Sequence, residues 1–120
     1  MEELKKEIRN NIQEIGRSNI AKAHENNSKF YIGKLIISDG VRNKGYSYDS
    51  IELNEKAYKK FINCDWGTIN ATENIEMNER NIERGYGDVM GEYDVGGNKI
   101  WIKTDLGKDT LTTIYLPSEW

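Results

Sequence analysis

The sequence predicts an α+β fold, in which an antiparallel β-meander sheet packs against an N-terminal helix and central helices. Apolar residues recur every three or four positions near the N-terminus, which is typical of an amphipathic helix. The last third of the chain alternates apolar and polar residues in runs separated by glycine-containing turns, which indicates strands joined in hairpins. A chain of 120 residues fits one domain, with residues 1–27 as an N-terminal helical segment and residues 28–120 as the α+β core.

The first predicted element is a helix over residues 2–26. Its apolar stripe consists of Leu4, Ile8, Ile12 and Ile15. Gly16 follows the stripe and predicts either a kink or a boundary between two short helices. Because the rest of this helix is polar, we expect the stripe to be buried, either on the chain's own sheet or in a homodimer. Docking within a monomer is favoured, since a short stripe broken by a glycine makes a poor coiled coil.

The next segment predicts a strand followed by an irregular loop. Residues 30–37 are β-branched and aromatic, which favours a strand. Residues 41–50 have no clear periodicity, which indicates an exposed loop with room for a short strand between Tyr46 and Tyr48.

Two further helices are predicted in the middle of the chain. Residues 55–63 place apolar side chains at helical spacing, and Asn54 is the candidate N-cap of this helix. A second, more polar helix ends at Arg84, with Asn70 or Thr72 as its N-cap and a glycine in the left-handed position that follows it.

The last part of the chain predicts three strands joined by glycine-containing turns. They cover residues 88–95, 99–104 and 111–116. In the middle strand Ile100 and Ile102 face the core helices, so Trp101 lies between two lysines on the opposite face. Trp101 then either covers the back of the sheet or is an exposed aromatic anchor for a partner protein. Pro117 ends the last strand because it has no N–H group for the ladder.

Composition restricts the class of protein. Hydrophobic residues are 37% and charged residues 31% of the chain, and the net charge of −3 does not indicate a generic DNA-coating protein. No apolar run approaches the roughly 18 residues of a membrane span. The N-terminal residues lack the apolar core of a signal peptide. We therefore expect a cytoplasmic protein without a membrane partner.

The sequence offers little support for catalysis. Cys64 is the single cysteine and His24 the single histidine, so neither an internal disulfide nor a His/Cys zinc cluster is expected. No Gly-x-Ser-x-Gly elbow accompanies a hydrolase triad. The glycines at Gly85, Gly87 and Gly91 lead from a helix into a strand, which is the reverse of the order that binds a phosphate. We expect no catalytic residues, no metal and no cofactor.

Acidic residues are concentrated between residues 49 and 95, where 11 carboxylates accompany 5 basic side chains. A solvated helix face with pairs such as Glu76 and Arg80 explains them in structural terms. In functional terms they form an acidic patch that docks on a basic partner, with aromatic anchors beside it. The predicted partner-binding residues are Tyr46, Tyr48, Glu73, Glu76, Glu79, Glu83 and Trp101.

Four motifs in the C-terminal half carry a family resemblance. They are Asp65-Trp66-Gly67, Gly91-Glu92-Tyr93, the run 99–105 (KIWIKTD) and the run 112–120 (TTIYLPSEW). In this order, over residues 51–120, they resemble a group of small plasmid- and phage-borne proteins of unknown biochemical function. Those proteins tend to have an apolar residue where Lys103 stands and an Asp-Arg turn before the paired threonines, so no role is transferred to that turn. The resemblance implies an origin on a mobile element and a bias toward binding host machinery.

These observations predict a phage or mobile-element accessory protein that acts by binding a host protein or protein complex. Inhibition of a host defence complex, of the anti-CRISPR or anti-restriction type, is the most specific form of this prediction. One alternative is a nucleic-acid-binding regulator, whose affinity would depend steeply on salt. Its basic side chains would be Lys5, Lys6, Arg9, Arg17, Lys22, Arg42 and Lys44. The other alternative is a small enzyme that loses activity when Asp65 or Asp105 is changed to Asn.

Overall fold

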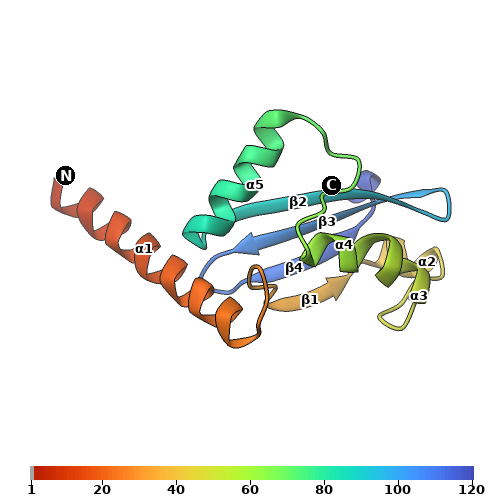
Figure 1. The fold of residues 1–120 in the computed structure, drawn as a ribbon, viewed down its shortest axis with the longest axis horizontal. Coiled ribbons are helices and arrows are strands. Elements are labelled where there is room, and N and C mark those ends of the chain that lie inside the picture. Colours follow the sequence, from red (N-terminus) through yellow and green to blue (C-terminus); the bar gives the residue numbers. More distant parts are fainter. Residues whose placement is uncertain (1) are drawn as a thin grey trace.

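The computed structural model describes residues 2–120 and shows helices arranged around one four-stranded sheet (Figure 1). The predicted α+β class is confirmed. The strands are β1 (Lys34–Ile37), β2 (Gly87–Val95), β3 (Asn98–Leu106) and β4 (Leu111–Tyr115). Their order across the sheet is β1-β4-β3-β2.

The prediction of a purely antiparallel meander is wrong for one strand. β2, β3 and β4 are antiparallel neighbours, as the hairpin signals predict, but β1 pairs parallel to β4. Long segments, including the central helices, separate β1 from β4 in the sequence, and a connection of that length allows parallel pairing, which a tight hairpin does not. β1 is also shorter than the predicted strand over residues 30–37, because residues 30–33 come before the first residue that pairs with β4.

The core lies between one face of the sheet and the central helices. Ile100 and Ile102 are fully buried on this face, as predicted from their alternation with Trp101. Val41, Leu53 and Phe61 pack against them from the helical side. The core helices are α2 (Asp39–Asn43), α3 (Ile51–Leu53), a π-helical segment η1 (Asn54–Tyr58) and α4 (Lys59–Ile62).

Three local expectations for this region differ from the structure. Residues 39–43 form the short helix α2 instead of the start of a loop, because the hydroxyl of Ser38 accepts a hydrogen bond from the Val41 N–H (3.2 Å) and caps the helix. The helix predicted after Asn54 begins earlier, with Ser50 as its N-cap residue, and Asn54 lies inside a continuous helical path. No strand forms between Tyr46 and Tyr48.

The long N-terminal helix α1 (Glu2–Glu25) runs through Gly16 without a break. A β-carbon at Gly16 would collide with the carbonyl oxygen of Arg84, so this glycine allows α1 to cross closely over the end of α5 (Thr72–Arg84). The predicted kink is therefore wrong, and Gly16 is a point of helix contact. Gly85 adopts the predicted left-handed conformation (φ 71°) after α5, but the N-cap of α5 is Ala71 and not Asn70 or Thr72.

The first half of α1 projects away from the sheet (Figure 1). The buried residues of α1 are Gly16, Asn19 and Ala23, all in its second half. Leu4 and Ile8 are 55% and 52% exposed, so the expected docking of the whole apolar stripe on the sheet is wrong. Hydrogen bonds attach α1 to the rest of the fold instead.

Asn19 makes these hydrogen bonds. Its side-chain amide donates to the carbonyl oxygens of Gly85 (2.9 Å) and Gly107 (3.0 Å), and its side-chain oxygen accepts from the Thr110 hydroxyl (3.1 Å). One buried side chain therefore joins α1 to the end of α5 and to the β3–β4 turn.

The chain ends in a short 3-10 turn, η2 (Pro117–Glu119), after β4 has stopped at Tyr115. The Glu119 carboxylate accepts hydrogen bonds from the Ser38 hydroxyl (2.6 Å) and the Gly40 N–H (3.0 Å). This contact ties the C-terminal turn to the start of α2.

The different burial of the two halves of α1 gives a stability prediction. Removal of residues 2–11 should leave the free energy of unfolding unchanged within about 0.5 kcal/mol, because solvent-exposed groups contribute little. Asn19→Ala should lower it by about 2–3 kcal/mol, because it removes three buried or partly buried hydrogen bonds and leaves the Gly85 carbonyl without its side-chain donor. Urea denaturation of both variants measures the difference, and equal losses would contradict the asymmetry.

Candidate partner-binding site

The outer edge of β2 is closed by side chains of α5. The Asn78 side chain donates to the Met90 carbonyl (2.8 Å) and accepts from the Met90 N–H (2.9 Å), as a neighbouring strand would. Asn81 donates to the Asp88 carbonyl (2.7 Å). Both asparagines are buried, so these bonds fix the position of α5 against the sheet.

The same edge is closed further along by the segment before α5. Glu92 donates its backbone N–H to the Trp66 carbonyl (3.1 Å) and accepts from the Thr68 N–H (2.8 Å). Gly67, at φ 70°, lies so close to the Glu92 backbone that a β-carbon there would collide with it. Trp66 itself is buried against Phe61 at 5.7 Å between ring centroids.

Trp101 lies in an aromatic cluster on the sheet face opposite the core. Its ring is perpendicular to those of Tyr115 (5.9 Å) and Trp120 (6.1 Å), which stack on each other. The Lys103 ammonium lies 4.9 Å from the centroid of Trp120, which is 72% exposed. Trp101 is half-buried, so it covers the back of the sheet and still has surface available to a partner.

Glu92 is held in its ionised form beside Trp101. Its carboxylate accepts from the Thr68 hydroxyl (2.6 Å) and the Trp101 indole N–H (2.7 Å), and the Lys99 ammonium lies 3.7 Å away. The hydrogen bond from Thr68, together with those from Trp101 and Lys99, outweighs partial burial and lowers the pKa of Glu92 below its ordinary value. A fixed negative charge therefore stands on this face of the sheet.

A small cavity of about 250 Å³ lies between Glu92, Trp101 and α5. We call it the Glu92 notch. Its lining residues are Ile69, Asn74, Met77, Asn78, Met90, Glu92 and Trp101. Apolar side chains and one ionised carboxylate thus share one concave surface. The notch was not predictable from the sequence, because its residues come from a loop, a helix and two strands that only the closed edge of β2 brings together.

Asp88 and Asp105 form a second feature of the open face. They are opposite each other on β2 and β3, and the hydrogen bond with Asp105 raises the pKa of Asp88. The nearby Tyr115 hydroxyl is buried and has no hydrogen-bond partner in residues 2–120. Burial, followed by the negative charges of Asp105 and Asp88, raises the pKa of Tyr115 to about 12. The pKa values of Asp88 and Tyr115 are therefore shifted in the opposite direction to that of Glu92.

The four predicted glutamates of α5 are all exposed. They are Glu73, Glu76, Glu79 and Glu83. The three ion pairs found among residues 2–120 include none of them, so the pair suggested between Glu76 and Arg80 is not formed. The structure leaves these carboxylates free in solvent, next to the edge of β2 that carries the notch.

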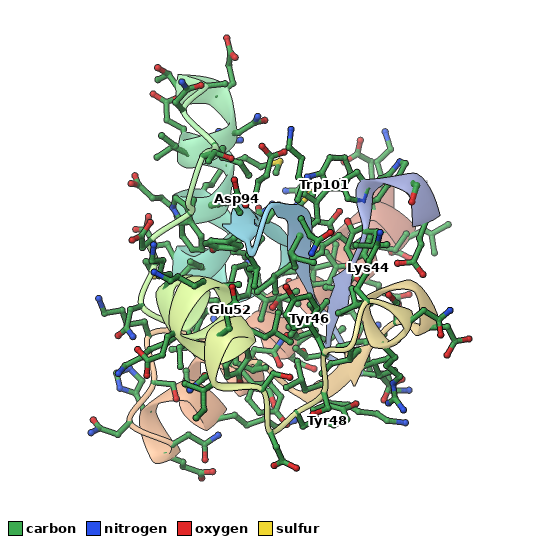
Figure 2. All side chains as sticks on the ribbon, turned by 90° about the vertical axis from the view of Figure 1, so that its right-hand side faces the viewer. Lys44, Tyr46, Tyr48, Glu52, Asp94 and Trp101 are labelled. Carbon is green, nitrogen blue, oxygen red and sulfur yellow. The ribbon has the colours of Figure 1, made fainter. Side chains whose placement is uncertain are left out.

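Tyr46 and Tyr48 lie at the end of the molecule that faces the viewer in Figure 2. Both hydroxyl groups bond to backbone. The Tyr46 hydroxyl donates to the Val95 carbonyl (3.0 Å). The Tyr48 hydroxyl donates to the Leu35 carbonyl (3.2 Å) and accepts from the Ile37 N–H (3.4 Å), which closes the outer edge of β1. The structure does not join these tyrosines to the glutamates of α5, and their role in partner binding stays a prediction.

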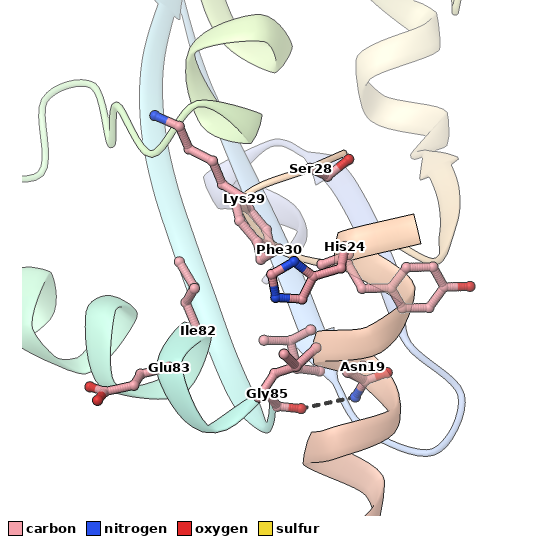
Figure 3. A pocket seen from close by; sticks show the side chains of 12 residues that line it. Asn19, His24, Ser28, Lys29, Phe30, Ile82, Glu83 and Gly85 are labelled. Carbon is pink, nitrogen blue, oxygen red and sulfur yellow. Dashed lines mark hydrogen bonds between the residues drawn. The ribbon is translucent and has the colours of Figure 1, made fainter. Parts of the chain in front are cut away.

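A second cavity, of about 260 Å³, lies where α1 meets the end of α5 (Figure 3). His24 lines it, and Phe30 and Ile82 supply apolar walls. The polar groups of Lys29 and Glu83 point away from His24, and Lys29 donates instead to the Asn63 carbonyl (3.1 Å). The polar side chains therefore do not converge on one point in this cavity.

Cys64 is half-buried, and burial raises the pKa of its thiol, opposed by the charge of Lys29. Asp65, one of the two aspartates considered for catalysis, accepts a hydrogen bond from the Gly67 N–H (3.0 Å) and shapes the turn. In residues 2–120 no group of three or more histidine, cysteine or acidic side chains has the arrangement of a metal site. None of the helices described in that range has the length and apolar character needed to cross a membrane.

Comparison of the chain with protein-family models, with curated proteins and with solved structures finds no match in any of the three.

The edge closure gives a stability prediction. Asn78→Ala leaves the N–H and C=O of Met90 unpaired beneath α5, so the free energy of unfolding should fall by about 2–4 kcal/mol. Asn74→Ala, one turn earlier at an exposed position, is the matched control and should change it by less than about 0.5 kcal/mol. Urea denaturation measures both, and comparable losses in the two variants would show that Asn78 has no special role.

The charge of Glu92 gives a pH prediction. Because the pKa of Glu92 is lowered in the folded protein, its bond to Trp101 should persist at neutral pH and break only below the ordinary glutamate value of 4.5. The indole N–H resonance of Trp101, followed by NMR during acidification, should report this transition. The transition should vanish in Glu92→Gln. A wild-type midpoint at or above 4.5 would contradict the fixed charge.

Proposed function

We propose that this chain is a non-enzymatic accessory protein of a phage or other mobile element, and that it acts by binding a basic surface of a host protein or protein complex. The observation that carries this proposal is the concentration of negative charge on α5 and β2. Residues 72–95 contain seven carboxylates and two basic side chains. The carboxylates are Glu73, Glu76, Glu79, Glu83, Asp88, Glu92 and Asp94, and we call this surface the acidic corner.

The acidic corner has the physical properties of a docking surface. Its glutamates on α5 are exposed and unpaired, so they are free to steer a basic partner by long-range attraction. Trp101 and the Glu92 notch, to which α5 contributes Met77 and Asn78, offer apolar area, from which most binding energy at protein interfaces comes. One helix thus contributes charge on its exposed face and apolar area to the notch.

The local chemistry favours binding over catalysis. General acid–base catalysis needs a titratable group whose pKa lies near the working pH. In the notch, Glu92 has a lowered pKa and is already bonded to Thr68 and Trp101. These properties suit a permanent negative charge that recognises a cation.

A host defence nuclease is the partner class that we propose. The resemblance of residues 51–120 to plasmid- and phage-borne proteins supports a mobile-element origin. Nucleases that hold a nucleic-acid duplex do so in positively charged channels. An acidic surface carried on a helix could occupy such a channel, whereas a nucleic-acid-binding role would place acidic residues against phosphates.

A comparison of two fourfold variants tests this proposal. The first changes Glu73, Glu76, Glu79 and Glu83 to Gln. The matched control changes the same number of glutamates on the projecting helix, Glu2, Glu3, Glu7 and Glu14, to Gln. For a host partner captured from lysate, the first variant should associate roughly tenfold more slowly and with a flatter salt dependence, because steering is lost.

The control variant should associate at the wild-type rate, and both variants should melt at the wild-type temperature. The measurement is surface plasmon resonance over a series of salt concentrations. Equal rates for the wild type and both variants would contradict the acidic corner as the interface. A loss confined to the α1 variant would place the interface on the projecting helix.

A further inference from the structure

We propose that the Glu92 notch is a binding site for a basic side chain, arginine or lysine, presented by the partner protein. This inference rests on the proposed function and specifies which group of the partner enters the acidic corner. It assigns Glu92 as the charged contact and the apolar walls as contacts for the aliphatic stem.

The carboxylate of Glu92 has unused capacity to accept hydrogen bonds. A carboxylate offers about four acceptor positions. One oxygen accepts from the Trp101 indole, and the other accepts from the Thr68 hydroxyl. Lys99 lies 3.7 Å away with 63% of its side chain exposed, so it is a loosely held neighbour that a better donor can displace.

The walls of the notch suit the stem of a basic side chain. Arginine and lysine bury their methylene groups on apolar surface and keep the charged end near polar groups. Met77 and Met90 are flexible and polarisable, so they adapt to stems of different shape. Trp101 adds an aromatic ring, the side chain that attracts cations most strongly. The volume of about 250 Å³ equals that of about eight water molecules, enough for one such side chain.

The charges around the notch favour a cationic ligand, and they leave the notch available to a partner. Six further carboxylates lie on α5 and β2, so an anionic ligand would be repelled. Lys103, the other lysine of β3, is engaged by Asp105 (3.4 Å) and the Trp120 ring. A bare metal ion is a poorer fit, because the notch presents a single carboxylate and metal ions require several ligands.

The test uses small analogues of the side chain and does not depend on knowing the partner. Butylguanidinium and butylammonium are titrated into the full-length protein, with butanol as the neutral analogue. The Trp101 indole N–H and the methyl groups of Met77 and Met90 are followed by NMR. Both cations should produce saturable shifts, with a Kd on the order of millimolar, and butanol should bind at least roughly tenfold more weakly.

Three variants locate the binding. Glu92→Gln should weaken binding of both cations at least tenfold, and Met77→Ala should weaken it severalfold without loss of the carboxylate. Glu55→Gln, at an exposed position on η1 that pairs with Lys59, is the matched control and should bind as the wild type does. If Glu92→Gln lowers the melting temperature, the cation binding of Met77→Ala decides whether the notch is the site, because Met77 is only half-buried.

The outcomes separate this inference from the proposed function. Shifts that do not saturate, equal binding of butanol, or unchanged binding in both Glu92→Gln and Met77→Ala would overturn the notch as a cation site. If the fourfold α5 variant loses its partner while the notch binds no cation, the proposed function stands and the assignment of a basic side chain fails. If the notch binds the cations but no captured partner depends on α5, the binding site stands and the proposed function fails.

Discussion

The free edge of β2 is the constraint on which the rest of the structure depends. An edge strand exposes unpaired N–H and C=O groups, and these need partners when other elements cover them. Asn78 supplies both a donor and an acceptor to Met90, Asn81 supplies a donor to Asp88, and the backbone on either side of Gly67 pairs with Glu92. The edge is thereby completed without a fifth strand, and α5 is held in one orientation.

Both the attachment of α1 and the Glu92 notch follow from that orientation. The end of α5 presents Gly85, on which Gly16 packs and to which Asn19 is bonded. The middle of α5 presents Met77 as one wall of the notch, while Met90 and Glu92 face it from β2. A change that releases α5 from the edge would therefore loosen the N-terminal helix and open the candidate binding site together.

Patterns of apolar residues predicted much of the fold, but polar side chains decided the rest. The alternation of Ile100 and Ile102 with Trp101 identified the core face correctly, because period-two burial is a local property of a strand. The roles of Asn19 and Asn78 were not predictable in this way, because their partners are 66 and 12 residues away in the sequence. Trp101 and the acidic helix were recognised as candidate contacts because each follows from a local pattern. The notch between them was not recognised, because its residues are distant in the sequence.

Hydrogen exchange at the Met90 amide is the direct measure of whether α5 replaces a strand at the edge of β2. In wild-type protein this N–H is bonded only to a side chain, Asn78, whereas its neighbours on β2 bond to β3. Met90 should exchange as slowly as Val89 and Gly91, with the free energy of global unfolding, because the helix leaves the edge only when the sheet unfolds. Fast exchange at Met90 beside slow exchange at Val89 and Gly91 would show that α5 detaches on its own, and would contradict a fixed wall for the Glu92 notch.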